Sequence, residues 1–530
     1  MPLLNVENLS VDFVTRNGVN RAVDNLSFQV EAGKVTAIIG ESGSGKSVAC
    51  YSLLGLVPQP PGKIEGGSAM FEGRDLLQCS QSQLQKIRGR DIAMVFQDPM
   101  TCLNPYMTIG KQLIEPLRLH QNISKSDARA RAIELMQEVG IRDPDQTIDQ
   151  YPHQFSGGMR QRVMIAMALI NEPKLLIADE PTTALDVTLQ AQILELLSQL
   201  RQKRNIGILF ISHDLSVVAD IADNIYVMRQ GSVVESGSSY RVFETPEHEY
   251  TKQLLAAIPR AMHSGKPRNT TTLVEVNRLS TWFGQAQGQP LKAVDNVSFE
   301  IQKGEVLGLV GESGSGKSTL GRTLLQLIAP HSGRTFYDGV DLGEMSTAEL
   351  SALRRKMQII FQDPFSSLNP RMTVQDTLAE PLLWHGIASR STVGSAVMSL
   401  MDDVGLPRSA VRKYPHEFSG GQRQRIAIGR ALATRPEFVV ADEPVSALDV
   451  TIQAQILSLL EDLGNEYGLT MLFISHDLAV VRQIADRIMV MRKGKIVELA
   501  STQNLFEHPQ EHYTQELLRA IPGDKILAPN

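Results

Sequence analysis

The sequence has 530 residues, which is too long for one ordinary hydrophobic core and indicates either two large domains or about three to four smaller ones. Apolar residues make up 42% and charged residues 21%, close to average globular usage, which excludes a disordered or fibrous chain. With 52 Lys and Arg against 58 Asp and Glu, the net charge of −6 argues against sequence-independent nucleic-acid binding, because that needs a basic surface.

The longest uninterrupted apolar run, residues 163–170, is far shorter than the roughly 20 residues of a membrane-spanning helix. The N-terminus shows no basic start followed by an apolar stretch, so we expect no signal peptide. The three cysteines, Cys50, Cys79 and Cys102, lack the spacing of a metal site, and a reducing cytoplasmic compartment is the simplest interpretation.

In chain order, the first part of the sequence alternates short apolar strands with helices. Residues 34–39 form a β-branched run that ends at glycines, and a helix is expected from Lys46. A second strand is expected at 174–178, a helix at 188–201 and a third strand at 207–211. This alternation predicts a mostly parallel sheet with helices on both faces, that is, an α/β fold.

The chain then repeats itself at the scale of a whole domain. Residues 40–47 recur unchanged as 311–318, and residues 178–181 recur unchanged as 441–444. We therefore predict a tandem duplication. The expected parts are a first domain at 1–260, a polar and flexible linker at 261–272 and a second domain at 273–530.

A glycine-rich phosphate-binding pattern opens the first helix of each copy, Gly-x-x-x-x-Gly-Lys-Ser. Its glycines let backbone N–H groups surround phosphates, and the helix that follows offers its positive N-terminal end. The lysine is expected to reach phosphate oxygens and the serine to bind Mg²⁺. The nucleotide-binding residues predicted here are Gly40, Ser42, Gly43, Gly45, Lys46, Ser47 and Val48, and Gly311, Ser313, Gly314, Gly316, Lys317, Ser318 and Thr319.

Two adjacent carboxylates follow a buried strand in each copy. Phosphoryl transfer needs an acid that helps hold the metal, here Asp179 or Asp442, and a group that polarises water, here Glu180 or Glu443. An Asp-Glu pair alone is also typical of a solvated turn, but the buried strand and the phosphate-binding pattern favour a catalytic role.

A Ser-Gly-Gly sequence precedes a helix at Ser156, Gly157 and Gly158, and again at Ser419, Gly420 and Gly421. It suits either a simple helix cap or a second place where backbone N–H groups grip a phosphate.

These motifs together resemble the nucleotide-binding domains of ABC transporters. The resemblance also rests on Gln97 and Gln362, on Ala-Leu-Asp at 184–186 and 447–449, and on His213 and His476, and it covers nearly the whole chain twice. It implies two tandem ABC-type P-loop NTPase domains. Each would have a RecA-like α/β core, a β-rich N-terminal part and an α-helical subdomain, at about 100–156 in the first copy and 365–419 in the second.

The resemblance further implies two ATP molecules held between domains packed head to tail. The first site would combine Lys46, Glu180 and His213 with residues 419–421, and the second Lys317, Glu443 and His476 with residues 156–158. The residues expected around Mg²⁺ are Ser47, Gln97, Asp179, Ser318, Gln362 and Asp442. Asp186 and Asp449 would communicate across the domain interface, and the two histidines would contact the γ-phosphate, although a histidine at a strand end is also commonly structural.

Phe13 and Phe283 occupy the place where the family stacks an aromatic ring on adenine, although a role in the core, or a replacement by Trp282, also suits the sequence. One signature residue differs between the copies, Met159 against Gln422. We therefore expect the site closed by the first signature to hydrolyse ATP somewhat more slowly.

An ABC ATPase without membrane spans is either the motor of a transporter or a soluble factor acting on ribosomes or DNA. The short linker and the net charge favour the transport motor. Residues 96–105 and 361–370, with the Tyr-Thr-x-x-Leu-Leu tails at 250–255 and 513–518, resemble the fused ATPases of bacterial dipeptide, oligopeptide and microcin C importers (the Yej type). Transport of nickel or another small solute in place of peptides would require almost the same sequence, so it stays an alternative cargo.

This resemblance implies ATP and Mg²⁺ as cofactors. The expected partners are two integral-membrane permease subunits and, indirectly, a peptide-binding protein outside the membrane, with no nucleic acid. The expected location is the cytoplasmic face of the bacterial inner membrane, peripherally bound. Because no cysteine follows Cys102, we expect no iron–sulfur cluster of the kind that many relatives carry after the tail.

Overall fold

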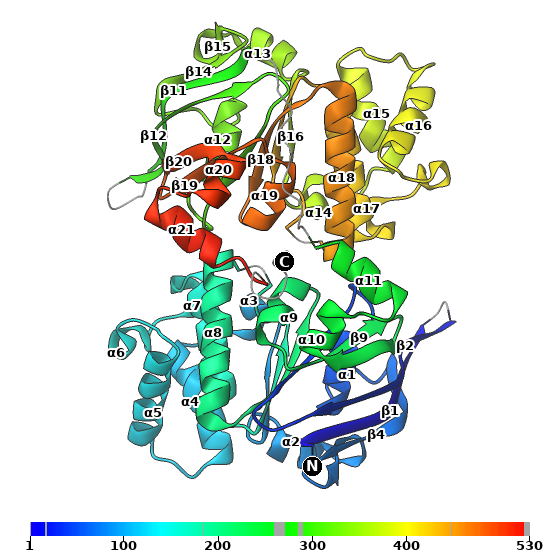
Figure 1. The fold of residues 1–530 in the computed structure, drawn as a ribbon, viewed down its shortest axis with the longest axis vertical. Helices are drawn as coiled ribbons and strands as arrows, with labels where there is room; N and C mark the ends of the chain where they lie inside the picture. The colour runs from blue at the N-terminus through cyan, green and yellow to red at the C-terminus, as the bar shows by residue number, and fades with distance from the viewer. Residues whose placement is uncertain are drawn as a thin grey trace. The chain divides into compact units, whose positions relative to one another are not determined.

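A computed structural model of the chain describes residues 2–15, 18–183, 185–258, 271–284, 290–446 and 448–523. It divides into two compact units (Figure 1). Unit 1 comprises residues 1–185, 189–258 and 522–530, and unit 2 comprises 186–188 and 259–521. Of the predicted linker, residues 261–270 lie outside the described residues, and Thr272 already belongs to a strand.

Unit 1 contains an antiparallel sheet and a mostly parallel sheet, in the strand orders β2-β1-β4-β5 and β10-β9-β3-β8-β7-β6. In the second sheet all neighbouring strands run parallel except β9 and β10. The strands are β1 (Leu4–Thr15), β2 (Gly18–Val30), β3 (Val35–Ile39), β4 (Gly62–Phe71), β5 (Arg74–Asp75), β6 (Ile92–Val95), β7 (Leu175–Asp179), β8 (Gly207–Ser212), β9 (Asn224–Arg229) and β10 (Ser232–Ser238).

Most helices of unit 1 lie in the connections between β3 and β9, and the last two follow β10. They are α1 (Lys46–Leu53), α2 (Gln81–Ile87), α3 (Pro99–Cys102), α4 (Ile109–His120), α5 (Lys125–Glu138), α6 (Pro144–Thr147), α7 (Gly157–Leu169), α8 (Val187–Arg204), α9 (Leu215–Ile221), α10 (Ser239–Glu244) and α11 (Glu249–Ala256). In Figure 1, α4, α5 and α6 gather beside α7, on the opposite side of unit 1 from the sheet that contains β1, β2 and β4.

Unit 2 repeats this arrangement, with strand orders β12-β11-β14-β15 and β16-β17-β18-β13-β19-β20. Its strands are β11 (Thr272–Phe283), β12 (Leu291–Gln302), β13 (Val306–Val310), β14 (Ser332–Tyr337), β15 (Val340–Asp341), β16 (Met357–Ile360), β17 (Phe438–Asp442), β18 (Thr470–Ser475), β19 (Arg487–Arg492) and β20 (Lys495–Ser501). Its helices are α12 (Lys317–Leu324), α13 (Thr347–Leu353), α14 (Pro364–Ser367), α15 (Val374–Trp384), α16 (Val393–Asp403), α17 (Gly420–Leu432), α18 (Val450–Tyr467), α19 (Leu478–Ile484), α20 (Thr502–Glu507) and α21 (His512–Arg519).

The parallel strands are buried because helices cover both faces of the sheet, so they read as continuous apolar runs. Every residue of β3, β7 and β8 is buried. In unit 1, one core cluster joins the antiparallel sheet, α1 and one face of the parallel sheet, and it includes Phe28, Cys50 and Leu209. The corresponding cluster of unit 2 includes Phe299, Leu320 and Leu472. The strand ends that lead into the predicted motifs, those of β3 and β7, therefore belong to a well-packed core.

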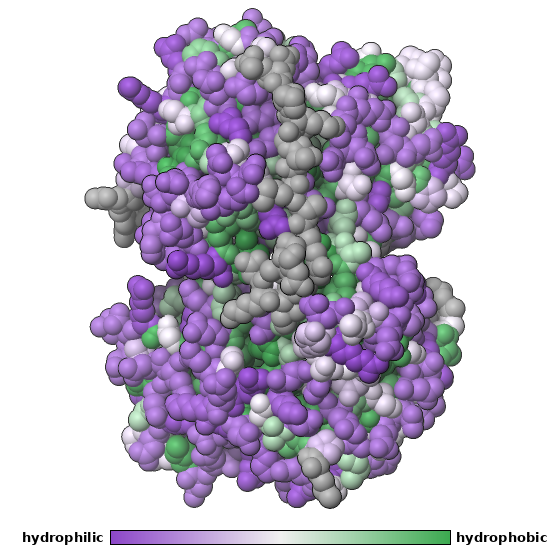
Figure 2. All heavy atoms as spheres, viewed as in Figure 1, coloured by the Kyte–Doolittle hydropathy of each residue, from purple (hydrophilic) through white to green (hydrophobic). Residues whose placement is uncertain are grey.

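The predicted tandem α/β fold, with its β-rich and helical parts, is confirmed. The predicted strands and the helix at 188–201 are found, with ends that differ by at most three residues. Among the described residues, no helix combines the length and the apolar character needed to span a bilayer. Figure 2 shows one face of the molecule, on which hydrophilic residues predominate and hydrophobic residues form small patches.

Candidate functional site

The glycine-rich loop of each unit links a central parallel strand to a helix, β3 to α1 and β13 to α12. Gly45 has a φ of 100°, and a Cβ there would lie 2.2 Å from the carbonyl oxygen of Ala22. Gly316 repeats this conformation, with a φ of 105°. A side chain would therefore be strained and would also clash, which explains why only glycine is suitable at this turn.

The loop lysine folds back on its own loop. The Nζ atom of Lys46 donates to the carbonyl oxygens of Gly40 and Glu41, at 2.7 and 2.9 Å. Lys317 donates to Gly311 and Glu312 at 2.7 and 3.0 Å, and its burial lowers its pKa. The remaining loop positions that were predicted to bind nucleotide lie beside it: Ser42, Gly43, Ser313 and Gly314 are exposed on the loop, and Val48 and Thr319 are in the first helical turn.

A serine and an aspartate meet at the start of the helix. The Ser47 hydroxyl donates to Asp179 Oδ1 at 2.9 Å, and the Ser318 hydroxyl donates to Asp442 Oδ1 at 2.7 Å. Burial raises the pKa of both aspartates, because a buried negative charge is costly. Such a charge favours a cation beside it.

A glutamine, a glutamate and a histidine form a second cluster next to this pair. In unit 1, Glu180 accepts from Gln97 Nε2 at 2.9 Å and lies 3.1 Å from His213 Nδ1. In unit 2, Glu443 accepts from Gln362 Nε2 at 2.9 Å and lies 3.0 Å from His476 Nδ1. The structure thus brings together residues that are more than 80 positions apart in each copy.

The charges of this cluster support each other. Burial alone would raise the pKa of Glu180, but the hydrogen bond and charge of His213 and the charge of Lys46 hold it below its usual value. For His213, burial works toward a lower pKa, while the hydrogen bond and charge of Glu180 raise it above the usual value. The same opposing causes act on Glu443 and His476. The glutamate is therefore ionised near neutral pH.

Both glutamates have a left-handed backbone, with φ of 48° for Glu180 and 46° for Glu443. This conformation is uncommon for a residue with a side chain and costs of the order of 1–3 kcal/mol. The neighbouring strand holds it in place, because the N–H of Glu180 donates to Ile211 O at 3.0 Å and that of Glu443 donates to Ile474 O at 3.0 Å. The turn aims each carboxylate toward the glutamine and the histidine.

The residues present suit Mg²⁺ and a nucleoside triphosphate. The serine hydroxyl, the aspartate carboxylate and the glutamine side-chain oxygen are hard oxygen ligands of the kind that Mg²⁺ prefers. The glycine loop leads directly into a helix, whose positive N-terminal end favours a bound phosphate. Within the described part of the chain, no three His, Cys, Asp or Glu side chains are grouped as a metal site.

One neighbour of the aspartate differs between the units and is not among the residues predicted from the sequence. In unit 2, Arg322 Nη2 lies 3.6 Å from Asp442 Oδ2. The equivalent position in α1 is Tyr51, whose pKa is raised by burial and by the charge of Asp179. Aligning the two phosphate loops in the sequence would have revealed this difference.

The aromatic residues predicted to stack on adenine have unlike surroundings. Phe13 is partly buried and packs against the core of unit 1, whereas Phe283 is 41% exposed. Trp282 stacks on His331, with ring centroids 3.9 Å apart, and Lys292 Nζ lies 4.7 Å from its ring centroid.

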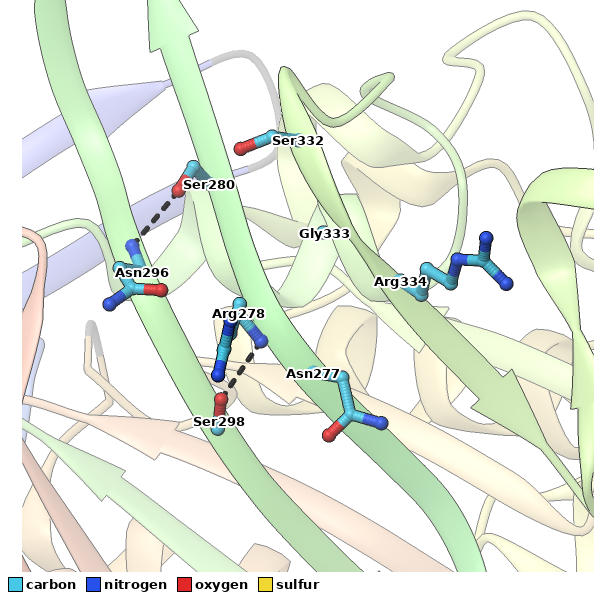
Figure 3. Close-up of a pocket in the computed structure, with 8 residues that line it drawn as sticks. All are labelled: Asn277, Arg278, Ser280, Asn296, Ser298, Ser332, Gly333 and Arg334. Atoms are coloured by element: carbon cyan, nitrogen blue, oxygen red, sulfur yellow. Dashed lines mark hydrogen bonds between the residues drawn. The ribbon is translucent and has the colours of Figure 1, made fainter.

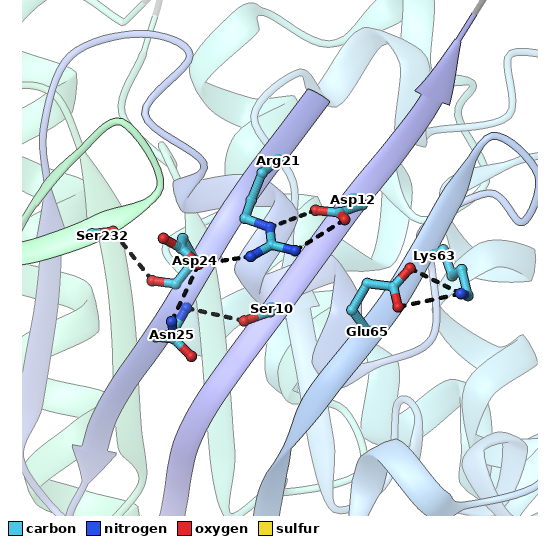
Figure 4. Close-up of polar contacts among 8 residues, drawn as sticks. All are labelled: Ser10, Asp12, Arg21, Asp24, Asn25, Lys63, Glu65 and Ser232. Carbon is cyan, nitrogen blue, oxygen red and sulfur yellow. Dashed lines mark hydrogen bonds and ion pairs between the residues drawn. The ribbon is translucent and has the colours of Figure 1, made fainter. Parts of the chain in front are cut away.

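At the same place in the sheet of unit 1, an ion pair replaces this stack. Asp12 accepts two hydrogen bonds from Arg21, at 2.9 and 3.2 Å, and Arg21 also reaches Asp24 (Figure 4). The strand pairing matches Asp12 with Arg21 in unit 1 and Trp282 with Lys292 in unit 2. The two units therefore differ in chemistry where the adenine is expected, and the assignment of Phe13 and Phe283 stays a prediction.

Each Ser-Gly-Gly motif caps a helix. Ser156 accepts from the N–H of Met159 at the start of α7, and Ser419 accepts from the N–H of Gln422 at the start of α17. Gln422 also accepts from the N–H of Ser419 at 3.1 Å, which completes a capping box. Methionine has no side-chain oxygen for this bond, so the caps of the two signature helices differ, and the slower hydrolysis expected at the site closed by the first signature stays a prediction.

The predicted inter-domain aspartates lie at the start of the next long helix. Asp186 accepts from the Thr188 hydroxyl at 2.9 Å, and Asp449 caps α18 by accepting from the N–H of Ile452. Ala184 and Ala447 of the same motif lie outside the described residues. The role of the aspartates between domains stays a prediction.

An open pocket of about 680 Å³ lies on the antiparallel sheet of unit 2 (Figure 3). In it, the backbone N–H groups of Arg278 and Asn296 donate to the hydroxyls of Ser298 and Ser280. None of the nucleotide-site residues predicted from the sequence lines this pocket, which is formed by Asn277, Arg278, Ser280, Asn296, Ser298, Ser332, Gly333 and Arg334.

Comparison with known proteins agrees with this geometry. A family model described as "ABC transporter" matches residues 23–183 and 294–446, and one described as "Oligopeptide/dipeptide transporter, C-terminal region" matches 234–279 and 497–525. The "Peptidoglycan transport ATP-binding protein YejF" of Agrobacterium fabrum is 47% identical over 98% of this chain and 96% of its own length. The "Glutathione import ATP-binding protein GsiA" of Shigella boydii is 46% identical over 98% of this chain and 89% of its own length.

The two phosphate loops, the two Gln-Glu-His clusters and these matches lead to one conclusion: the chain belongs to the ABC transporter family, as a tandem ATP-binding protein that carries the oligopeptide/dipeptide transporter C-terminal region twice.

Proposed function

We propose that the chain is the ATP-hydrolysing motor of a bacterial importer and couples hydrolysis to the uptake of peptides through separate permease subunits. The observation that carries this proposal is the repetition of one geometry, with Ser beside Asp and Gln and His beside Glu, in both units. Two complete sets of hydrolytic residues suit two working sites rather than one working and one silent site.

Each site would join the phosphate loop of one unit with the Ser-Gly-Gly motif of the other. Bound Mg²⁺–ATP supplies the transferable γ-phosphoryl group, together with the metal charge that offsets the phosphate charge. Ser47 and Asp179 would hold the metal with Gln97, and Lys46 would leave the loop carbonyls to meet phosphate oxygens. Ser318, Asp442, Gln362 and Lys317 would do the same in the second site.

The glutamate and the histidine would then act on the attacking water. Glu180 is ionised and fixed in direction, so it would accept a hydrogen bond from the water and orient it. His213 holds Glu180 in place and would donate to the γ-phosphate. Glu443 and His476 have the matching roles, because their contacts are the same.

The substrate class follows from the C-terminal region and from the relatives. Glutathione is a peptide and peptidoglycan contains peptides, so the names of both relatives indicate cargo with peptide bonds. Nickel or another small solute is the alternative cargo. Two integral-membrane permease subunits and an external peptide-binding protein are the proposed partners, which would place the chain peripherally on the cytoplasmic face of the inner membrane.

Reconstitution tests this proposal. The chain would be co-purified with the permease subunits, placed in proteoliposomes and assayed for ATP hydrolysis and for uptake of labelled dipeptides, longer peptides and Ni²⁺. Replacing both Lys46 and Lys317 with alanine should abolish hydrolysis and peptide uptake together. Uptake of Ni²⁺ but not of peptides would overturn the cargo, and co-sedimentation with ribosomes in place of recovery with the permease would overturn the transport role.

A further inference from the structure

The C-terminal region of each unit reaches back to the phosphate loop. Tyr250, near the start of α11, is 3% exposed, and its hydroxyl oxygen accepts a hydrogen bond from the backbone N–H of Glu41 at 3.2 Å. Glu41 is the second residue of the glycine-rich loop, and Tyr250 opens the Tyr-Thr-x-x-Leu-Leu tail. The Tyr250 hydroxyl thus links the tail to the phosphate loop.

This hydroxyl and the loop lysine hold the same peptide group from opposite sides. The peptide that joins Gly40 to Glu41 has its carbonyl oxygen bonded to Lys46 Nζ at 2.7 Å and its N–H bonded to Tyr250. In a planar trans peptide these two groups point in opposite directions. Tyr250 therefore fixes the plane on which Lys46 rests.

The tail helix is itself anchored to the sheet. Both carboxylate oxygens of Glu235, in β10, accept backbone N–H groups just before α11, from Glu247 at 2.8 Å and from His248 at 3.1 Å. The guanidinium of Arg229 lies 4.8 Å from the centroid of the Tyr250 ring. These contacts hold the tyrosine in place from the sheet side.

Unit 2 contains the same chain of contacts, starting from the same Tyr-Thr-x-x-Leu-Leu motif of its own tail. The Tyr513 hydroxyl accepts from the N–H of Glu312 at 3.2 Å, and the carbonyl of Gly311 accepts from Lys317 at 2.7 Å. Glu498 accepts the two N–H groups before α21, at 2.9 and 3.2 Å, and Arg492 lies 4.4 Å from the Tyr513 ring centroid. Because the same contacts occur in both units at nearly equal distances, they are a feature of the C-terminal region.

We propose that Tyr250 and Tyr513 are positioning residues, through which the C-terminal region pre-organises the phosphate loop for the nucleotide. A loop whose first peptide plane is fixed has less conformational freedom to lose when its N–H groups close around phosphates. Without the hydroxyl the plane loses the hydrogen bond on its N–H side, and the lysine contact on its carbonyl side would be released when Lys46 meets phosphate. The inference rests on the nucleotide sites proposed above.

The test removes one oxygen atom in the full-length chain. Tyr250→Phe is made in a Lys317→Ala background, where only the first phosphate loop is intact, and Tyr513→Phe in a Lys46→Ala background. Binding of a fluorescent ATP analogue and thermal unfolding without nucleotide are measured for each. The matched control is Tyr226→Phe. The Tyr226 hydroxyl also accepts a backbone N–H at 3.2 Å, but its donor is Gln29 of β2 and not the phosphate loop.

We expect each tail substitution to raise the nucleotide Kd about fivefold, the effect of one net hydrogen bond, while the Tm falls no further than in Tyr226→Phe. Glu235→Ala should also raise the nucleotide Kd. Combining it with Tyr250→Phe should raise the Kd little further, because both substitutions act through the hydrogen bond between Tyr250 and Glu41. Equal Kd values for the tail variants and the Tyr226 control would overturn the inference. If the Lys317→Ala background itself binds no nucleotide, the proposed site has failed instead.

Discussion

Replacing Arg322 with tyrosine would give the second metal site the neighbour that the first site already has. Arg322 lies 3.6 Å from Asp442, the aspartate proposed to help hold Mg²⁺, whereas Tyr51 occupies that place beside Asp179. A fixed positive charge beside the aspartate competes with a divalent cation. We therefore predict that the second site binds metal more weakly than the first.

The size of this effect follows from Coulomb's law. The Arg322 side chain is 44% exposed and Asp442 is 1% exposed, so water screens the pair only in part, and the dielectric constant of water gives the lower limit of the effect. At 3.6 Å this gives about 1 kcal/mol, or about a fivefold difference in Kd. Arg322→Tyr should tighten metal binding at the second site by about that factor.

Mn²⁺ is the suitable probe, because free Mn²⁺ is counted directly by electron paramagnetic resonance. The wild-type chain, saturated with a non-hydrolysable ATP analogue, should show two classes of Mn²⁺ sites. Arg322→Tyr should merge them at the tighter value, and Tyr51→Arg should merge them at the weaker value. Arg322→Lys keeps the charge and serves as the control.

The electrostatic reasoning fails if Arg322→Tyr and Arg322→Lys give the same affinity, or if removal of the charge weakens binding. High salt provides a second check, because a screened charge loses its effect as ionic strength rises. The difference between wild type and Arg322→Tyr should therefore shrink in 1 M salt.

Three further predictions concern the signature, the histidine and the loop. Met159→Gln should complete a capping box and speed hydrolysis at the site that this signature closes, seen in single-turnover assays with the other site inactivated; an unchanged rate would contradict the proposed asymmetry. The pKa of His213 is raised above 6.5, and that of Glu180 is lowered below 4.5. Between these two pKa values both groups are charged, so their pairing stabilises the nucleotide-free fold. This stabilisation is lost as the pH rises through the raised pKa of His213. Thermal melts should then show His213→Gln costing more stability at pH 6 than at pH 9, and a pH-independent cost would refute the pairing. Gly316→Ala should lower the melting temperature more than Gly314→Ala, whose added Cβ meets nothing within 4 Å, because a Cβ at Gly316 lies 2.0 Å from a carbonyl oxygen; equal losses would show that this turn relaxes easily.

The residues expected to meet phosphate and metal were predictable because their chemistry demands particular residue types in a fixed local order. Gly45, Lys46 and Ser47 are adjacent in sequence, so their spacing alone indicated the loop. The strand that ends in Asp179 was equally visible, since a strand covered on both faces reads as an apolar run.

Contacts between distant segments were not predictable in the same way. The tail motif is visible in the sequence, but its tyrosine lies more than 200 residues from Glu41, and only the packing of α11 shows that they meet. The left-handed turn at Glu180 also leaves no mark in the residue pattern, because glutamate has no preference for that conformation. The same holds for Trp282, whose partner His331 belongs to another segment.

The tandem arrangement gives these local differences an evolutionary meaning. When one gene encodes a subunit that pairs with its own copy, any substitution alters both halves of the pair at once. Here Tyr51 and Arg322, or Asp12 and Trp282, stand at equivalent positions of one polypeptide, and a substitution in one half leaves the other half unchanged. A tandem chain can therefore give its two proposed nucleotide sites different surroundings, which two copies of one subunit cannot do.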